Sequence, residues 1–224
     1  MAITKEFIAF LKHPVLIEPD VLTFLQSIKL IIKGIVFYIF LSIGYILLIA
    51  LLSLIGLDLP ELPAAKMSKI YRSVIIAPVI EELIFRLPLR NFYKNVFVLG
   101  GLFLYIVLKK LIPVPLAAIF GLVSMVLPYF PKLAGRLEIN INNFVKQYYV
   151  GVFYFFAFSF GIAHITNLLN ISSETYLSLL VYLINPLAVG LFFAFVRIKY
   201  KNGILYAIIL HSLTNLLHYL PAFF

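Results

Sequence analysis

Long apolar runs dominate the chain and are separated by short groups of proline, glycine and charged residues. A helix needs about 20 apolar residues to cross the ~30 Å hydrocarbon core of a bilayer. The pattern predicts membrane-spanning helices at 34–57, 72–90, 95–109, 111–130, 148–169, 176–196 and 203–223. We therefore expect an all-α fold, a polytopic transmembrane helical bundle with about seven spans, within a range of about six to eight.

The segments 95–109 and 111–130 form the least regular part of this pattern. Lys109 and Lys110 interrupt an otherwise continuous apolar stretch, and several prolines can kink or end the second segment. A pair of crossing helices, a shallow hairpin or a single broken helix would each fit. The pattern therefore leaves open whether both segments cross the membrane.

Composition agrees with a membrane protein. Of the 224 residues, 63% are apolar and only 12% are charged, whereas a soluble domain has about half its residues apolar and about a quarter charged. No stretch indicates a separate soluble domain, so we expect residues 1–224 to form a single integral membrane domain. The absence of cysteine excludes disulfides, thiolate nucleophiles and thiolate metal sites.

The net charge of +9 comes from basic residues scattered between the apolar segments, which is not the pattern of a nucleic-acid surface. We predict no nucleic-acid partner. With the N-terminus inside, 13 of the 18 Lys and Arg residues fall on the inner side and 5 on the outer side. The positive-inside rule then predicts a cytoplasmic N-terminus and an outer C-terminus. The longest polar connection, 131–147, would face the cytoplasm.

The N-terminal segment lacks the charged start, short apolar core and small-residue cleavage site of a signal peptide, so we expect it to be retained. Residues 3–12 are predicted to form a short amphipathic helix on the membrane surface.

The charged residues Glu81, Glu82 and Arg86 lie within the predicted span 72–90. Such groups are costly in a bilayer and normally mark a working site. Glu82 and Arg86 are four positions apart, so they share a helix face and can pair. Glu81 points about 100° away, so any partner of Glu81 must come from another helix. One interpretation is that the three residues form a structural ion-pair network. A salt bridge to Arg86 needs only one acid, however, so the second carboxylate favours a role in proton transfer.

Later spans carry further polar residues at helical spacing. Phe160 and His164 share a face, as do His211 and Asn215 one turn apart. A lone histidine on an apolar helix, such as His164, is more often a hydrogen-bonded interior residue than a catalytic one. The imidazole of His211 and the carboxamide of Asn215 can both donate hydrogen bonds, which is what holding an oxyanion requires. His218, near the end of its helix, is interpreted as interfacial. At ~1.5 Å per residue, Glu81, His164 and His211 lie at similar depths and could meet near the midplane.

Together the motifs E-E-x-x-x-R at 81–86, F-x-x-x-H at 160–164 and H-x-x-x-N at 211–215 resemble those of the CPBP family of intramembrane proteases. That family, named for CAAX proteases and bacteriocin-processing enzymes and also called the Abi family, includes type II CAAX prenyl endopeptidases. The order and the spacing within each motif match. The resemblance covers about residues 70–220.

The resemblance implies a role for each motif residue. Glu81 would be the general base of a metal-independent glutamic protease, and His164 would help to hold the attacking water. His211 and Asn215 would form the oxyanion hole. The remaining motif residues would support the site, which are Glu82, Arg86 and Phe160. No cofactor and no metal ion are implied.

One feature departs from the family. Its members commonly have the first two motifs a few tens of residues apart, whereas 83 positions separate Glu81 from His164 here. The excess is interpreted as an insertion of the spans 95–109 and 111–130. An insertion of both spans keeps the two motifs on the same side of the membrane.

Other classes of function stay open at this point. Glu81, His164 and His211 would also suit a catalytic zinc site, although no H-E-x-x-H motif is present. A non-catalytic scaffold, a bacteriocin-immunity protein or a proton-coupled transporter could carry the same buried carboxylates. For a protease, the expected partners are the lipid bilayer and a peptide or protein substrate reached from the membrane. The expected location is the inner (plasma) membrane of a bacterium.

Overall fold

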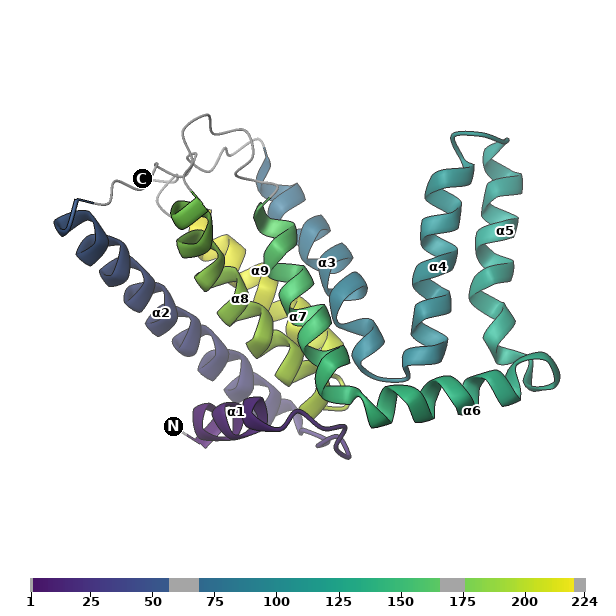
Figure 1. The fold of residues 1–224 in the computed structure, drawn as a ribbon, viewed down its shortest axis with the longest axis horizontal. Helices are drawn as coiled ribbons and strands as arrows, with labels where there is room; N and C mark the ends of the chain where they lie inside the picture. The colour runs from purple at the N-terminus through teal and green to yellow at the C-terminus, as the bar shows by residue number, and fades with distance from the viewer. Residues whose placement is uncertain (1, 57–68, 166–175, 220–224) are drawn as a thin grey trace.

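The computed structural model describes residues 2–56, 69–165 and 176–219. These residues are helical apart from turns and the irregular connection 13–23, which holds an isolated bridge between Asp20 and Tyr200. The all-α bundle predicted from the sequence is confirmed (Figure 1). The α-helices are α1 (Ala2–Lys12), α2 (Phe24–Leu54), α3 (Ala77–Phe85), α4 (Phe92–Leu108), α5 (Val114–Val126), α6 (Pro131–Gln147), α7 (Tyr149–Ile165), α8 (Tyr176–Lys199) and α9 (Gly203–Tyr219). The shorter turns are η2 (Arg72–Ile76), η3 (Leu87–Leu89) and η4 (Leu127–Tyr129).

Each predicted span overlaps a helix of the structure. Within the described residues, Phe24–Leu54 and Leu180–Lys199 are by themselves long and apolar enough to cross a bilayer, and shorter apolar helices lie at Phe92–Leu108, Val114–Tyr129 and Tyr149–His164. The first span begins well before the expected residue 34. Thr23 and Gln26 form a capping box, in which each side chain bonds the other's backbone N–H, and this starts α2 at Phe24.

The core gathers around α8, which contacts α2, α7 and α9. Its segment 192–198 is buried throughout. The predicted N-terminal helix exists as α1, but its apolar face is covered by protein. Phe7 packs against Phe192 and Phe195 of α8, with ring centroids 5.5 Å apart in both pairs. The apolar face of α1 is therefore part of the bundle core.

The region between the first two motifs forms a separate antiparallel hairpin of α4 and α5, beside the bundle (Figure 1). A Cβ atom at Gly101 would lie 2.5 Å from the carbonyl oxygen of Gly121, so the two backbones touch at positions that only glycine allows. The chain returns to its starting end, as an insertion of both spans requires. The polar connection 131–147 is the helix α6, tied to α4 by an ion pair of 3.5 Å between Lys94 and Glu138.

The second predicted span is shorter than expected and begins with a wide turn. The π-helical turn η2 leads directly into α3, where Pro78 lies in the first turn and cannot donate a backbone hydrogen bond. The helix ends at Phe85 rather than continuing to residue 90, because the segment 87–89 around Pro88 tightens into η3. Turns of the π type are frequent at functional sites.

Candidate active site

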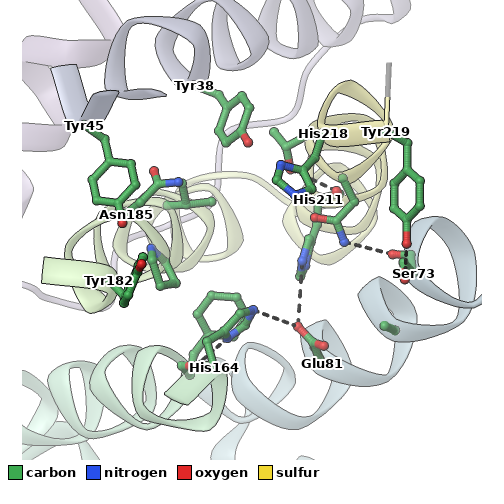
Figure 2. A pocket seen from close by; sticks show the side chains of 16 residues that line it. Tyr38, Tyr45, Ser73, Glu81, His164, Tyr182, Asn185, His211, His218 and Tyr219 are labelled. Atoms are coloured by element: carbon green, nitrogen blue, oxygen red, sulfur yellow. Dashed lines mark hydrogen bonds and ion pairs between the residues drawn. The ribbon is translucent and has the colours of Figure 1, made fainter. Parts of the chain in front are cut away.

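A cavity of about 440 Å³ lies among α2, α3, α7, α8 and α9 (Figure 2). Glu81, Phe160, His164, His211 and Asn215 all line it. These residues come from three separate sequence motifs, and the fold brings them to one place. The remaining lining residues are Tyr38, Tyr45, Ser73, Ala77, Tyr182, Asn185, Pro186, Val189, Thr214, His218 and Tyr219.

Glu81 projects from α3 toward histidines on two other helices. Its Oε2 atom lies 3.8 Å from Nε2 of His164 and 3.7 Å from Nε2 of His211. Both distances are too long for a direct hydrogen bond, and Oε2 has no hydrogen-bond partner among the described residues. The side chain is 30% exposed, whereas that of Glu82 is fully buried. Glu81 therefore presents a carboxylate oxygen to the cavity between two imidazoles.

Glu82 is not among the residues that line the cavity, and it pairs with Arg86, as their spacing predicted. Its Oε2 lies 3.4 Å from Nε of Arg86, and both side chains are 0% exposed. Nη2 of Arg86 also donates to the carbonyl oxygen of Gly190 at 3.4 Å. The guanidinium carbon lies 3.7 Å from the ring centroid of Phe160, a cation–π contact. Arg86 thus ties α3 to α7 and α8.

His211 connects the two glutamates. Its Nδ1 lies 2.9 Å from Oε1 of Glu82, while its Nε2 faces Glu81. An ionised carboxylate only accepts hydrogen bonds, so Nδ1 carries a proton. The rings of Phe160 and Phe193 pack against the imidazole, with centroids 5.7 and 5.4 Å away. The spacing of the motifs gave no sign of the bond to Glu82, which fixes the orientation of this ring.

His164 is oriented by its own helix. Its Nδ1 donates to the carbonyl oxygen of Phe160, one turn earlier, at 2.9 Å. In the neutral ring this leaves the lone pair of Nε2 directed toward Glu81. The Phe160 ring lies 4.5 Å from the His164 ring. Phe160 therefore contacts His164, His211 and Arg86 together, which gives the F-x-x-x-H spacing a structural reason.

Asn215 is held by the π-helical turn. Its Nδ2 donates to the carbonyl oxygen of Ser73 at 2.8 Å, which leaves its second amide N–H for another acceptor. The hydroxyl of Tyr219 bonds Oγ of Ser73 at 2.9 Å. The turn η2 thus positions the carboxamide in the cavity wall.

Several residues that line the cavity lie outside the three sequence motifs. His218 was interpreted as interfacial, but it lines the cavity. Tyr38 and Tyr45 of α2, with Asn185 of α8, are further lining residues outside the motifs. The available signal was the seven-residue spacing of the two tyrosines, which places them on one face of an apolar helix. Among the described residues, no group of three or more His, Cys, Asp or Glu side chains is arranged to hold a metal ion.

Comparison with protein families gives a match described as type II CAAX prenyl endopeptidase Rce1-like, over residues 63–217. The chain belongs to this family. No curated protein and no solved structure gives a significant match. Rce1-like proteins are membrane-embedded endopeptidases of the CAAX type, which fits the apolar bundle. The matched residues contain all three motifs and the α4–α5 hairpin, whereas α1 and α2 precede them.

Proposed function

We propose that the protein is an intramembrane endopeptidase in which Glu81 activates a water molecule that attacks a peptide bond, with no metal ion and no covalent intermediate. The observation that carries this proposal is the position of Oε2 of Glu81 in the cavity, 3.8 and 3.7 Å from the Nε2 atoms of His164 and His211. A free carboxylate beside two imidazoles has the groups that general-base hydrolysis needs.

The attacking water is held by Glu81 and His164. With its Nδ1 proton donated to the Phe160 carbonyl, neutral His164 offers the Nε2 lone pair as an acceptor. A water molecule that donates one hydrogen to Glu81 and the other to His164 keeps an oxygen lone pair free. That lone pair points into the cavity and attacks the carbonyl carbon of the substrate.

The oxyanion is stabilised by His211 and Asn215. Asn215 contributes the amide N–H that its bond to Ser73 leaves over. Because Nδ1 of His211 is committed to Glu82, its Nε2 can donate only when the ring is doubly protonated. Imidazolium at His211 and guanidinium at Arg86 then balance the two carboxylates. The charged ring places a strong donor where negative charge develops.

The proton balance closes within the site. Glu81 takes a proton from the water as the C–O bond forms, and the carbonyl electron pair moves onto oxygen. The collapse of the tetrahedral intermediate breaks the C–N bond, and Glu81 gives its proton to the departing amine. Glu82 and Arg86 touch no reacting atom in this scheme. They hold His211 in place.

The substrate is a peptide or a membrane-associated protein that reaches the cavity from the bilayer. The membrane is the inner membrane of a bacterium, with the N-terminus in the cytoplasm. In support of this orientation, α1, α6 and the connection between α8 and α9 lie at one end of the bundle (Figure 1). Arg90, Lys94 and Lys201 lie on the segments at this end, and basic residues are typical of the cytoplasmic side.

The decisive experiment compares the wild-type protein with Glu81→Gln in native membranes and in proteoliposomes. We expect Glu81→Gln to abolish cleavage and to retain bound peptides, which mass spectrometry then identifies. A non-catalytic scaffold would keep its cellular phenotype after this substitution. A proton-coupled transporter would lose coupling and would show no cleaved product in the wild type.

Metal content tests the zinc alternative, in which Glu81, His164 and His211 are ligands. We expect purified, active protein to hold no stoichiometric zinc and to keep its activity in a chelator. One zinc ion per chain, with activity that chelation removes and zinc restores, would replace the metal-independent mechanism.

A further inference from the structure

Across the cavity from Glu81 lies a wall of neutral polar side chains. Tyr38 and Tyr45 of α2 and Tyr182 and Asn185 of α8 form it, and we call it the α2–α8 wall. Figure 2 shows Tyr45, Tyr182 and Asn185 grouped away from Glu81, with Tyr38 between this group and His218. None of the four side chains is charged. The mechanism proposed above uses none of them.

The geometry of α2 explains why this wall faces a space. Gly34, Tyr38 and Tyr45 follow helical spacing on one face. At Gly34 the helix touches α9, because a Cβ atom there would lie 2.5 Å from Cδ2 of Leu210. Beyond this contact α2 leans away from α8 and α9 (Figure 1). The two tyrosines are therefore placed where the bundle opens.

Two polar atoms of this region are buried without partners. Oδ1 of Asn185 and Oγ of Ser42, one turn after Tyr38 on α2, have no hydrogen-bond partner among the described residues. A buried polar group without a partner is unfavourable, and native proteins rarely keep one without a reason. The reason is clearest at Asn185, whose side chain lines the cavity. An occupant that supplies hydrogen bonds would satisfy it.

The α2 half of the wall is a property of this chain rather than of the matched region. The family match begins at residue 63, after the end of α2 at Leu54. The catalytic motifs all lie inside the match. Substrate selection can therefore differ between this protein and other family members through α2, with the catalytic groups unchanged.

We propose that the α2–α8 wall is a substrate subsite that hydrogen-bonds the backbone of an extended, unlipidated peptide segment next to the scissile bond. Hydroxyl and carboxamide groups both donate and accept, which matches the alternating N–H and C=O groups of an extended chain. Inside a bilayer those backbone groups have no water to bond. A lipid chain would leave Oδ1 of Asn185 without a hydrogen bond.

This inference rests on the proposed function, because it assigns a position to the substrate of that reaction. In it, Tyr38, Tyr45 and Asn185 are positioning residues. They act on binding and on the register of the peptide, and not on proton transfer. Their loss should raise KM and leave kcat unchanged.

Photo-crosslinking tests the subsite without catalysis. The Glu81→Gln variant in proteoliposomes is illuminated with a pool of randomised short peptides that carry a diazirine side chain. The same pool with a farnesylated cysteine serves as the lipidated probe. We expect the unlipidated pool to label α2 and α8. In the Tyr38→Phe/Tyr45→Phe background this labelling should fall about tenfold, the effect of two lost hydrogen bonds. Tyr148→Phe, at an exposed tyrosine, is the matched control.

Absence of labelling on α2 would overturn the subsite, and so would labelling confined to the farnesylated pool or unchanged by the double substitution. Kinetics separates this failure from failure of the catalytic proposal. If Glu81→Gln is inactive while Tyr38→Phe/Tyr45→Phe keeps the wild-type KM, only the subsite fails. If Glu81→Gln still cleaves, the catalytic proposal fails, and the crosslinks decide the subsite independently. A KM increase of about tenfold at constant kcat supports both.

Discussion

The two sides of α3 place the same type of side chain in opposite surroundings. Glu82 is fully buried, bonded to His211 and paired with Arg86 from its own helix. Glu81 is 30% exposed and lines the cavity, and its Oε2 lies 3.8 and 3.7 Å from the Nε2 atoms of His164 and His211. A carboxylate with close partners stabilises the fold, whereas one with an open side is available to a substrate or to water. The two glutamates should therefore fail differently when they are changed.

The largest expected effect is on catalysis at the cavity side. Glu81→Gln should lower kcat by about 10⁴, the upper range for loss of a general base, and should leave the unfolding midpoint in detergent unchanged. Glu138→Gln on α6 is the control, because it also neutralises a partly exposed glutamate in an ion pair. Substantial activity in Glu81→Gln would remove the distinction between the two sides.

The next effect should be on stability at the buried side. Arg86→Ala leaves Glu82 buried without its cation, and we expect the free energy of unfolding to fall by about 3–5 kcal/mol. Lys94→Ala breaks a partly exposed ion pair with Glu138 and should cost less than about 1 kcal/mol. Denaturant titrations in mixed micelles would measure the free energy of unfolding of both variants. Equal losses would mean that the burial of Arg86 carries no special energetic weight.

Asn215 tests whether the cavity side extends beyond Glu81. Asn215→Ala removes an oxyanion donor and should reduce kcat by about 10²–10³, with a small change in KM. It also removes the bond to Ser73, so its thermal unfolding must be measured alongside. Asn143→Ala, on an exposed part of α6, is the matched control. A change confined to KM would place Asn215 in substrate binding instead.

The smallest effect probes the packing behind Arg86. A Cβ atom at Gly190 would lie 2.7 Å from the Phe160 ring and 3.2 Å from Nη2 of Arg86. Gly190→Ala should therefore destabilise the protein by about 1–3 kcal/mol. Gly44→Ala has open space around it and should stabilise α2 by up to about 1 kcal/mol, the helix propensity of alanine over glycine. Thermal unfolding of both variants would show whether the signs are opposite.

The hydropathy pattern located the helices better than their ends. All predicted spans overlap helices, because apolar length is the main requirement for crossing a bilayer. The ends depend on local bonds that hydropathy does not register, such as the capping box at Thr23 and the turn η3 at Pro88. Lys109 and Lys110, between the predicted spans 95–109 and 111–130, lie in the turn of a helical hairpin and not at a break within one helix. The two helices of this hairpin pack closely at Gly101 and Gly121.

Helical spacing predicted which side chains of one helix lie close together, but it could not predict contacts between helices. The Glu82–Arg86 pair follows from its four-residue separation, and the pair is present. The bond from His211 to Glu82 joins residues 129 positions apart, and no local pattern encodes it. For the same reason, local patterns did not identify Tyr38, Tyr45 and Asn185 as residues that line the cavity. A tyrosine on an apolar helix is equally typical of a membrane-interface anchor.

The all-helical membrane architecture, the three motifs and the separation of Glu81 from Glu82 by about 100° around one helix all follow from the order of the residues. These are properties of composition and of helical geometry, which act over a few residues. The packing of the helices reveals which carboxylate lines the cavity, what orients each histidine, and that α2 contributes to the opposite wall. Those features depend on contacts between helices, whose formation is set by packing across the whole bundle.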